Sequence, residues 1–377
     1  MTRISIHKSS PKLPSHSMPI ARPGVLKISP YVGGDRGAES GKKLIRLASN
    51  ENNYGPSPKA IAAYQSRASL LHRYPDGSSA DLRAAIAEIY NFEVDRLICG
   101  NGSDELLHLA ALAYAGPGDE ILYSQHGFLV YPIAAHLAGA MPVTAPEINL
   151  TSSVDHLLAA VTPKTKIVFL ANPNNPTGSY LPKSEVIRLH RGLPPQVLLV
   201  LDAAYAEFVT EGDYESGAEL ARAAENIMLT HTFSKIYGLA GLRLGFAYAA
   251  PAIIDALNRI RGPFNINEAA SAAGIAAVHD QAYVTEIRQK ITATRAGFAA
   301  QLRQLGLTPR PSVANFILID FGTEHRAQAA NAWLKQNGIL TRLVTSYGLP
   351  HYVRMTLGTD AEMHEVSQSL SEFIARG

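Results

Sequence analysis

The stretch that decides the fold runs from Thr230 to Phe246 and reads THTFSKIYGLAGLRLGF. It continues an apolar run, Asn226–Leu229, that is typical of a buried strand. Lys235 follows in a turn of small and hydroxyl-bearing residues, with Arg243 eight positions further on. A lysine that forms a Schiff base with a flat cofactor needs such a turn, because the turn holds its amine in a cleft. A surface lysine in a glycine-rich loop is the alternative, and this stretch alone does not decide between the two.

Length and composition predict a soluble globular enzyme with two domains. The chain has 377 residues, of which 46% are hydrophobic and 18% charged. A formal net charge of +2, without long runs of Lys or Arg, argues against nucleic acid or a membrane surface as a partner. The single cysteine, Cys99, excludes an internal disulfide framework and fits a reducing compartment. Residues 1–23 lack the apolar core of a secretory signal and no segment has the length of a membrane span, so we expect a cytoplasmic protein.

Apolar runs alternate with helical patterns through the first two thirds of the chain. Lys166–Leu170 and Val197–Leu201 are almost continuously apolar, as strands buried on both faces are. Lys183–Arg191 lies between them and reads as a crossover helix. We therefore predict an α/β fold with a large, doubly wound, mostly parallel sheet covered on both faces.

The pattern changes after Pro263, which marks the predicted domain boundary. Glu268–Gln304 is rich in alanine and predicts one long or broken helix. Shorter strand and helix segments then alternate to the end of the chain. We predict a large domain over residues 44–266 and a smaller α/β domain over 267–377, which the N-terminal arm and residues up to 43 complete.

Three further motifs occur where strands are predicted to end. Asp202-Ala-Ala-Tyr205 ends the strand Val197–Leu201. The loop NPNNPTG, residues 172–178, follows the strand Lys166–Leu170, and its prolines make it stiff. The sequence GNGSDE, residues 100–105, joins a short strand to a helix, where free N–H groups can bind a phosphate. Each motif also has an ordinary structural interpretation as a strand cap, a turn or a helix cap.

Together with the lysine stretch, these motifs resemble fold-type I pyridoxal-phosphate aminotransferases, and most closely the histidinol-phosphate aminotransferase family. The resemblance extends from about Leu26 to Gly358. It implies a homodimer that binds pyridoxal 5′-phosphate, with small-molecule amino donors and 2-oxo acids as partners. The implied reaction exchanges an amino group between L-histidinol phosphate and 2-oxoglutarate, a step of histidine biosynthesis.

The predicted catalytic residues are Lys235, Asp202 and Tyr205. Lys235 would hold the cofactor, be displaced by the substrate amine and then act as acid and base. Asp202 would keep the pyridine nitrogen protonated, so that the ring stays an electron sink. Tyr205 and Asn175 would hydrogen-bond the phenolic oxygen of the ring. The predicted phosphate site comprises Gly102, Ser103, Asp104, Thr232, Ser234 and Arg243.

The chain departs from the family pattern at two places. Ala203 stands where the family usually has Glu, within Asp-Glu-Ala-Tyr. QHGFLVY, residues 125–131, replaces the commoner Pro-Thr-Tyr-x-x-Tyr, and by its spacing from Tyr131 Phe128 is the residue expected to stack on the cofactor ring. Phe128 cannot supply the hydroxyl of the usual tyrosine, and its alternative role is in the core of a helix.

The resemblance also assigns residues to the substrate and to the second subunit. Arg354 would hold the anionic end of the substrate, with Arg342 as a second arginine and Tyr31 in the same pocket. Two arginines suit a dianionic phosphate better than a single carboxylate. Tyr54 would reach the cofactor phosphate of the neighbouring subunit.

Other readings remain open. An aromatic amino-acid aminotransferase or a threonine-phosphate decarboxylase would share the scaffold and most motifs. A non-catalytic binding protein of the same fold is disfavoured by the intact Lys235, Asp202, Tyr205 and Arg243. The histidines are scattered, without a pair at metal-binding spacing, and we predict no metal site.

Overall fold

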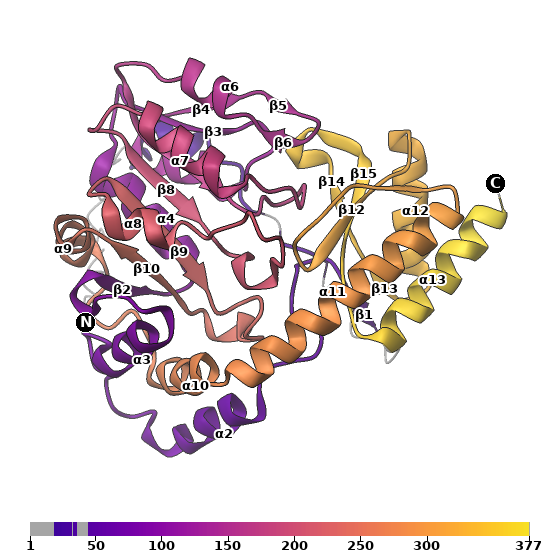
Figure 1. Ribbon diagram of the computed structural model, residues 1–377, viewed down its shortest axis with the longest axis horizontal. Coiled ribbons are helices and arrows are strands. Elements are labelled where there is room, and N and C mark those ends of the chain that lie inside the picture. Colours follow the sequence, from indigo (N-terminus) through magenta and orange to yellow (C-terminus); the bar gives the residue numbers. More distant parts are fainter. Residues whose placement is uncertain (1–18, 32, 36–43, 377) are drawn as a thin grey trace, which may run out of the picture.

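A seven-stranded sheet forms the larger part of the molecule (Figure 1). The computed structural model describes residues 19–31, 33–35 and 44–376. The strands lie in the order β2 (Leu97–Gly100), β10 (Gly245–Ala249), β9 (Ile227–Thr232), β8 (Leu198–Asp202), β7 (Thr165–Ala171), β3 (Glu120–Ser124) and β4 (Met141–Ala145). All neighbours pair in parallel except β10, which is antiparallel to β2 and β9. The predicted mostly parallel sheet is confirmed.

Strand β10 has no counterpart in the sequence-based prediction. Its residues, Gly245–Ala249, are mostly small and lack the β-branched side chains that favour strands. All five are buried between the two flanking strands, so they show no alternation of polar and apolar residues. The place of β10 in the sheet therefore depends on packing against β2 and β9, and the sequence of Gly245–Ala249 alone does not predict it.

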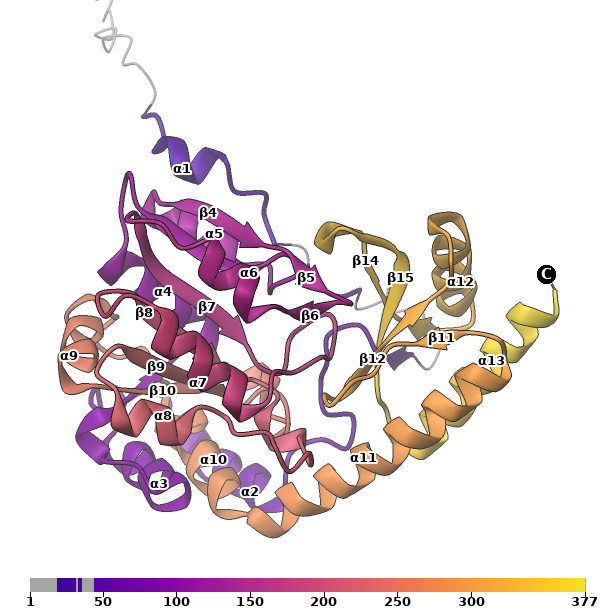
Figure 2. The ribbon, with the colours of Figure 1, turned by 45° about the horizontal axis from the view of Figure 1, so that its top comes forward.

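Helices cover both faces of this sheet, as Figures 1 and 2 show. One face packs on α4 (Ser103–Tyr114), α5 (Val130–Ala138) and α9 (Pro251–Ile260). The other packs on α3 (Ala80–Tyr90), α6 (Val154–Ala159), α7 (Lys183–Gly192) and α8 (Ala218–Ala223). Along β8, Leu199 and Leu201 point to the face covered by α3, α6, α7 and α8, and Val200 points to the face covered by α4, α5 and α9. This two-sided burial explains the continuous apolar runs in the sequence.

A four-stranded antiparallel sheet forms the smaller part. Its strands are β11 (Thr308–Pro309), β12 (Phe316–Asp320), β15 (Leu349–Thr356) and β14 (Arg342–Val344), in that order. Helices α12 (Glu324–Gln336), α13 (Asp360–Ala375) and the long α11 (Gln281–Gln304) pack against it or against one another. Figure 2 shows α11 running from the side of the large sheet to the small one.

Two connections cross the predicted domain boundary. The alanine-rich segment is broken at Asp280, and its first part, α10 (Glu268–His279), packs against α2 (Pro58–Ser66) and α3 on the larger side. Strand β1 (Ile45–Arg46) pairs in parallel with β13 (Ile339–Leu340) on the smaller side. The division at residues 266 and 267 stays a prediction, and residues 1–18, 32 and 36–43 of the predicted arm lie outside the described residues.

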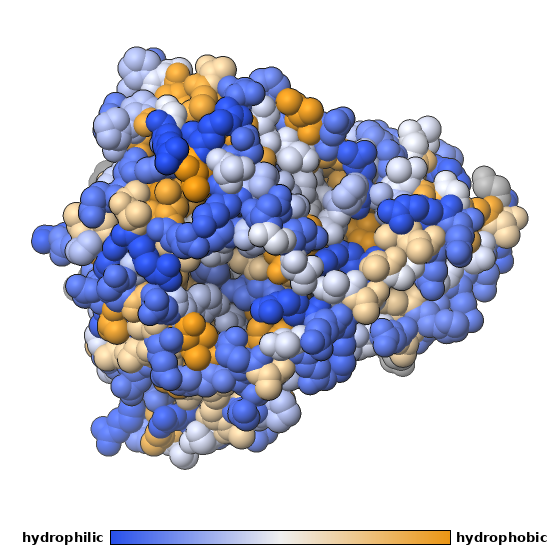
Figure 3. All heavy atoms as spheres, in the orientation of Figure 1, coloured by the Kyte–Doolittle hydropathy of each residue, from blue (hydrophilic) through white to orange (hydrophobic). Residues whose placement is uncertain are grey.

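The remaining elements are short. They are α1 (Pro23–Leu26), β5 (Glu147–Ile148), β6 (Thr151–Ser152) and the 3₁₀ turns η1 (Ala68–Leu70), η2 (Val94–Arg96), η3 (Ala206–Phe208), η4 (Ala240–Leu242) and η5 (Thr345–Tyr347). Among the described residues, no helix combines the length and the apolar character that a membrane crossing requires. Hydrophilic residues cover most of the face seen in Figure 3, with apolar side chains in small scattered groups.

The strands bring the predicted motifs to one edge of the large sheet. Strands β7, β8 and β9 are parallel, so their carboxyl ends, at Ala171, Asp202 and Thr232, lie side by side. Strand β2 ends at Gly100, and α4 begins three residues later at Ser103. Parallel α/β sheets bind their ligands at this edge.

Candidate active site

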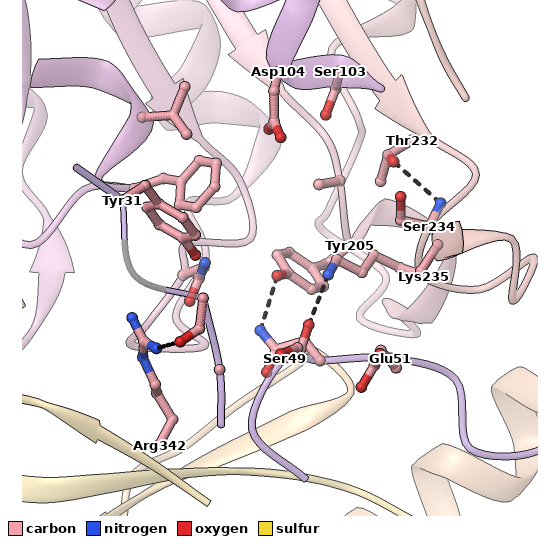
Figure 4. A pocket seen from close by; sticks show the side chains of 18 of the residues that line it. Tyr31, Ser49, Glu51, Ser103, Asp104, Tyr205, Thr232, Ser234, Lys235 and Arg342 are labelled. Carbon is pink, nitrogen blue, oxygen red and sulfur yellow. Dashed lines mark hydrogen bonds between the residues drawn. The ribbon is translucent and has the colours of Figure 1, made fainter. Parts of the chain in front are cut away.

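A cavity of about 640 Å³ lies at this edge, with walls from both sheets and from the segment after β1. The predicted residues that line it are Tyr31, Ser103, Asp104, Phe128, Asn175, Asp202, Tyr205, Thr232, Ser234, Lys235, Arg243, Arg342 and Arg354. Figure 4 shows several of them converging from different elements. Of the predicted site residues, Gly102 and Tyr54 do not line the cavity.

Lys235 projects into this cavity from the loop after β9. The loop is fixed by Phe233, whose ring is fully buried, and by Gly238, whose φ is +70°. A Cβ at Gly238 would lie 2.4 Å from the carbonyl oxygen of Gly55, so only glycine fits there. The Lys235 Nζ donates a hydrogen bond to the Ser49 carbonyl oxygen at 3.0 Å.

The amine of Lys235 is shifted toward its neutral form. Burial is the largest cause and the nearby Arg354 guanidinium is the next, and together they lower the pKa of Lys235 to about 8. The neutral fraction near pH 7 is therefore much larger than that of an ordinary lysine, although most of the amine is still protonated. Only the neutral amine is a nucleophile or a base.

Asp202 is a buried carboxylate at the end of β8, with a side chain only 5% exposed. The Tyr131 hydroxyl donates a hydrogen bond to Oδ2 at 2.9 Å, and the Thr230 hydroxyl donates to Oδ1 at 3.4 Å. Among the described residues Asp202 has no ion pair, and burial raises its pKa to about 6. A cationic N–H group in the cavity would supply the missing partner.

Tyr205 and Asn175 are both held by side chains distant in sequence. The Asn50 Nδ2 donates to the Tyr205 hydroxyl at 2.9 Å. The Arg354 guanidinium donates to Asn175 Oδ1 and, at 2.7 Å, to the carbonyl oxygen of Ala48. Because Oδ1 of Asn175 is an acceptor here, its Nδ2 remains available to donate to a ligand oxygen.

The first turn of α4 makes an anion-binding cup with Arg243. No side chain caps this helix, so its first backbone N–H groups are not taken by a cap. Gly102 precedes it with a φ of +81°, and a Cβ there would lie 2.4 Å from Nη2 of Arg243. Arg243 donates to Ser234 Oγ and to Asp104 Oδ2, both at 3.3 Å. The glycine, the open helix N-terminus and the arginine together fit a phosphate group.

The opposite wall of the cavity carries the predicted substrate residues. Arg342 and Arg354 lie directly opposite each other in the β14–β15 pair. Arg342 donates to the carbonyl oxygen of Gly33. Tyr31 is 51% exposed, and its ring packs edge-on against Phe128 at 6.5 Å between centroids.

Phe128 lies before the helix that the sequence predicted it to begin. The prediction placed the helix at Phe128–Leu137, whereas α5 begins at Val130. The Tyr131 N–H donates to the carbonyl oxygen of Phe128 in the preceding turn. This turn leaves the Phe128 ring on the cavity wall and not within the helix core.

The role of Tyr54 at the neighbouring subunit stays a prediction. The Tyr54 hydroxyl oxygen is shielded from solvent within its own protomer. The Lys290 Nζ lies 4.9 Å from the centre of its ring.

The sequence did not predict the roles of two residues that position the site. Asn50 holds Tyr205 and was predicted only to lie in a loop, and Tyr131 holds Asp202 and served only to align Phe128 with the family pattern. The signal for Asn50 was the run of three Asn in Asn50–Asn53, an unusual density of amides beside a strand. No local signal links Tyr131 to Asp202, which lies 71 positions away.

Comparisons with known proteins agree with this geometry. The family model for aminotransferase class I and II matches residues 42–370. A histidinol-phosphate aminotransferase of Rhodospirillum centenum is 54% identical over 359 residues, which cover 95% of this chain and 99% of that protein. One of Rhodopseudomonas palustris is 52% identical over 363 residues, with 96% and 100% covered.

Solved structures extend the comparison to the fold. The crystal structure of histidinol-phosphate aminotransferase from Sinorhizobium meliloti, in complex with pyridoxal-5′-phosphate, has a TM-score of 0.89 and 31% identity, covering 96% of this chain and 99% of that one. Aspartate aminotransferase from Thermus thermophilus with maleate, at 23% identity and a TM-score of 0.79, shares the fold, covering 89% of this chain and 92% of its own. The predicted fold-type I architecture and the resemblance to histidinol-phosphate aminotransferases are confirmed. The chain belongs to the aminotransferase class I and II family.

Proposed function

We propose that this aminotransferase transfers an amino group between L-histidinol phosphate and 2-oxoglutarate, a step of histidine biosynthesis. The observation that carries the proposal is a single cavity that holds Lys235 and, on its opposite wall, the paired arginines Arg342 and Arg354. The curated relatives support it, because they carry this name and align over nearly their whole length. Aromatic aminotransferase and threonine-phosphate decarboxylase activities are the competing proposals.

Pyridoxal 5′-phosphate is the proposed cofactor, and the residues present fit it. The cup at α4 suits its phosphate, the buried Asp202 suits its protonated ring nitrogen, and Asn175 and Tyr205 suit its phenolic oxygen. Phe128 lies on the wall where a ring could stack. When bound, the cofactor supplies an electron sink that makes a proton on the amine-bearing carbon of the substrate removable.

The chain itself moves that proton with Lys235. Its Nζ, with a pKa lowered to about 8, takes the proton from the amine-bearing carbon and later returns one. The bond to the Ser49 carbonyl oxygen keeps the amine within the cavity. Asp202 stays ionised when a cation lies beside it, because the opposite charge offsets the burial that raises its pKa.

Substrate binding is proposed to depend on the two arginines. Arg354 is buried, and its fork is oriented by Asn175 and Ala48. It would bind the anionic end of either substrate. Arg342 adds a second positive fork, which a phosphate dianion can use more fully than a carboxylate can.

We also propose a homodimer, built on an exposed apolar surface beside α2. Tyr74 is 83% exposed and stacks on Phe264, with 4.7 Å between the ring centres. Leu71, Tyr64 and Ile260 are exposed large apolar residues on the same or adjoining segments. Exposed apolar groups of this kind mark interaction surfaces. The cytoplasmic location expected from the sequence stays a prediction.

A donor panel tests the proposed reaction. Histidinol phosphate should be converted with 2-oxoglutarate far more efficiently than phenylalanine, and phosphothreonine should not be decarboxylated. Lys235→Ala should lower kcat by at least roughly 10²–10⁴-fold, because acid–base transfer at the substrate carbon is lost. Preference of the wild type for phenylalanine would move the protein to the aromatic class, and full activity of Lys235→Ala would remove the lysine from the mechanism.

The lowered pKa of Lys235 predicts how the cofactor-free protein takes up pyridoxal phosphate. The rate of attachment should rise with pH and level off above about 8, since only the neutral amine attacks. Stopped-flow absorbance over a pH series measures it. In Arg354→Gln the midpoint should move upward, because a nearby positive charge is lost. A midpoint near that of an ordinary lysine in the wild type would contradict the burial argument.

Tyr131→Phe should raise the pKa of Asp202, since the hydroxyl bond that favours the carboxylate is removed. A carboxylate is present only above its pKa, so activity on the acidic side should be lost at a higher pH than in the wild type. A hydrogen bond to a charged group is worth about 1.5–3 kcal/mol. The ring should still stack on Phe169, 4.7 Å away, and preserve the fold.

The matched control for Tyr131 is Tyr123→Phe. The Tyr123 ring packs edge-on against Tyr131, and no hydrogen bond joins it to Asp202 among the described residues. Its pH profile of kcat/KM should match the wild type. Equal shifts in both variants would mean that the effect is general packing and not the bond to Asp202.

Charge placed on the apolar surface tests the proposed dimer. Phe264→Glu should shift the protein toward monomer in sedimentation velocity, because a carboxylate would be buried in the interface. Ile148→Glu is the control, since Ile148 is 56% exposed on β5, away from this surface. A wild-type monomer, or a Phe264→Glu dimer of unchanged affinity, would refute the proposed surface.

A further inference from the structure

The segment Ser49–Asn52 presents one exposed carboxylate between two buried anchors. Asn50 is 1% exposed, and its Nδ2 bonds the Tyr205 hydroxyl while its backbone N–H donates to Thr356 Oγ1 at 2.9 Å. Asn52 is 8% exposed, and its Nδ2 donates to the carbonyl oxygen of Ile236, the residue after Lys235. Glu51, between them, is exposed.

The backbone of Glu51 is fixed as well. Its carbonyl oxygen accepts a hydrogen bond from Asn315 Nδ2 at 3.2 Å, and the same amide holds the carbonyl oxygen of Asn50 at 3.1 Å. Asn50 itself has a φ of +57°, which turns the chain sharply before Glu51. Three asparagines thus hold the backbone on both sides of Glu51, and one of them, Asn315, belongs to the smaller sheet's part of the chain.

The Glu51 side chain faces the cavity and has no partner of its own. It lines the main cavity and the adjoining smaller one of about 380 Å³. Its carboxylate makes no hydrogen bond or ion pair with the other described residues, whereas Asp104 in the same cavity is paired with Arg243. Figure 4 places Glu51 beside Lys235, with Arg342 and Tyr31 on the other side of Tyr205.

This arrangement separates two charges along the cavity. In Figure 4 Arg342 lies on one side of Tyr205, and Glu51 lies on the other side, beside Lys235. Arg354 is the register partner of Arg342 in the β14–β15 pair. Histidinol phosphate has a matching order of groups: a phosphate, the amine-bearing carbon and an imidazole. When the arginines hold the phosphate and Lys235 faces the amine-bearing carbon, the imidazole is directed away from the arginines.

We propose that Glu51 is a specificity-determining residue that accepts a hydrogen bond from the imidazole N–H of histidinol phosphate. The inference rests on the proposed function and names the group that distinguishes this donor from others. A carboxylate strengthens the bond when the ring is protonated, since the bond is then charge-assisted. A phenyl ring offers no N–H, so an aromatic donor lacks this hydrogen bond and gains less from the site than histidinol phosphate does.

Glu51→Ala tests the inference with two amino donors. For histidinol phosphate, kcat/KM should fall about 10- to 100-fold, the loss expected for one bond to a charged group. The loss should lie mainly in KM, because the imidazole contact is the same before and during the reaction. For L-glutamate, the donor of the reverse half-reaction, kcat/KM should be unchanged or higher, since glutamate has no imidazole and carries a negative side chain.

A second variant and a control separate the contact from a general effect. Glu51→Gln keeps an acceptor without the charge and should recover part of the loss. Glu372→Gln on α13 removes the same charge at an exposed position outside the cavity and should behave as wild type with both donors. Circular dichroism and cofactor absorbance should be unchanged in all three, because neither glutamate is buried.

The outcomes distinguish a failure of the proposed reaction from a failure of the role of Glu51. A wild type without activity on histidinol phosphate would overturn the proposed function, and the role of Glu51 with it. Two results with an active wild type would overturn the role of Glu51 alone. In one, Glu51→Ala lowers kcat/KM equally for both donors. In the other, it lowers kcat and leaves KM unchanged.

Discussion

The site depends on keeping two ionisable groups, Asp202 and Lys235, out of water, and neither has an ion pair among the described residues. Burial moves the pKa of Asp202 up to about 6 and that of Lys235 down to about 8, so each group is moved toward neutrality. Such an arrangement is unfavourable in the isolated chain, because desolvated charges without partners are costly. A ligand that brings a cationic ring nitrogen to one and a carbonyl to the other relieves both. The burial that is unfavourable for these two groups alone thus favours the binding of such a ligand.

Amides and hydroxyls hold this arrangement in place. Asn50 fixes Tyr205, Asn315 fixes the backbone of Asn50 and Glu51, and Tyr131 fixes Asp202. These neutral groups are buried and form hydrogen bonds with partners far away in sequence, so they orient the site without adding charge. They also explain why residues of the smaller sheet take part: Asn315 and Arg354 connect the two sheets through hydrogen bonds and not through apolar contact alone.

How much of this could be predicted from the sequence differs between elements. Strands β7 and β8 were predictable because burial on both faces leaves continuous apolar runs, and Lys235 was predictable because its loop carries a dense local motif. Strand β10 was not, since its five residues, three of them small, are all buried and take their conformation from the neighbouring strands. For Tyr54, the place in the loop follows from the local sequence, but the contact of its ring with Lys290 of α11 does not.

The helix α10 has a consequence for any attempt to dissect the molecule. Although it follows the predicted boundary in sequence, it packs on α2 and α3, and Gly274 lies so close to Leu244 that a Cβ would meet the Leu244 Cδ2 at 2.4 Å. A fragment that ends at residue 266 would lose this helix and expose the apolar side chains beneath it, such as Leu82. We therefore expect that the part with the large sheet does not fold well without α10. Its folding needs chain that is synthesised after the lysine loop is complete, so the nascent protein holds an unfinished core until α10 has emerged.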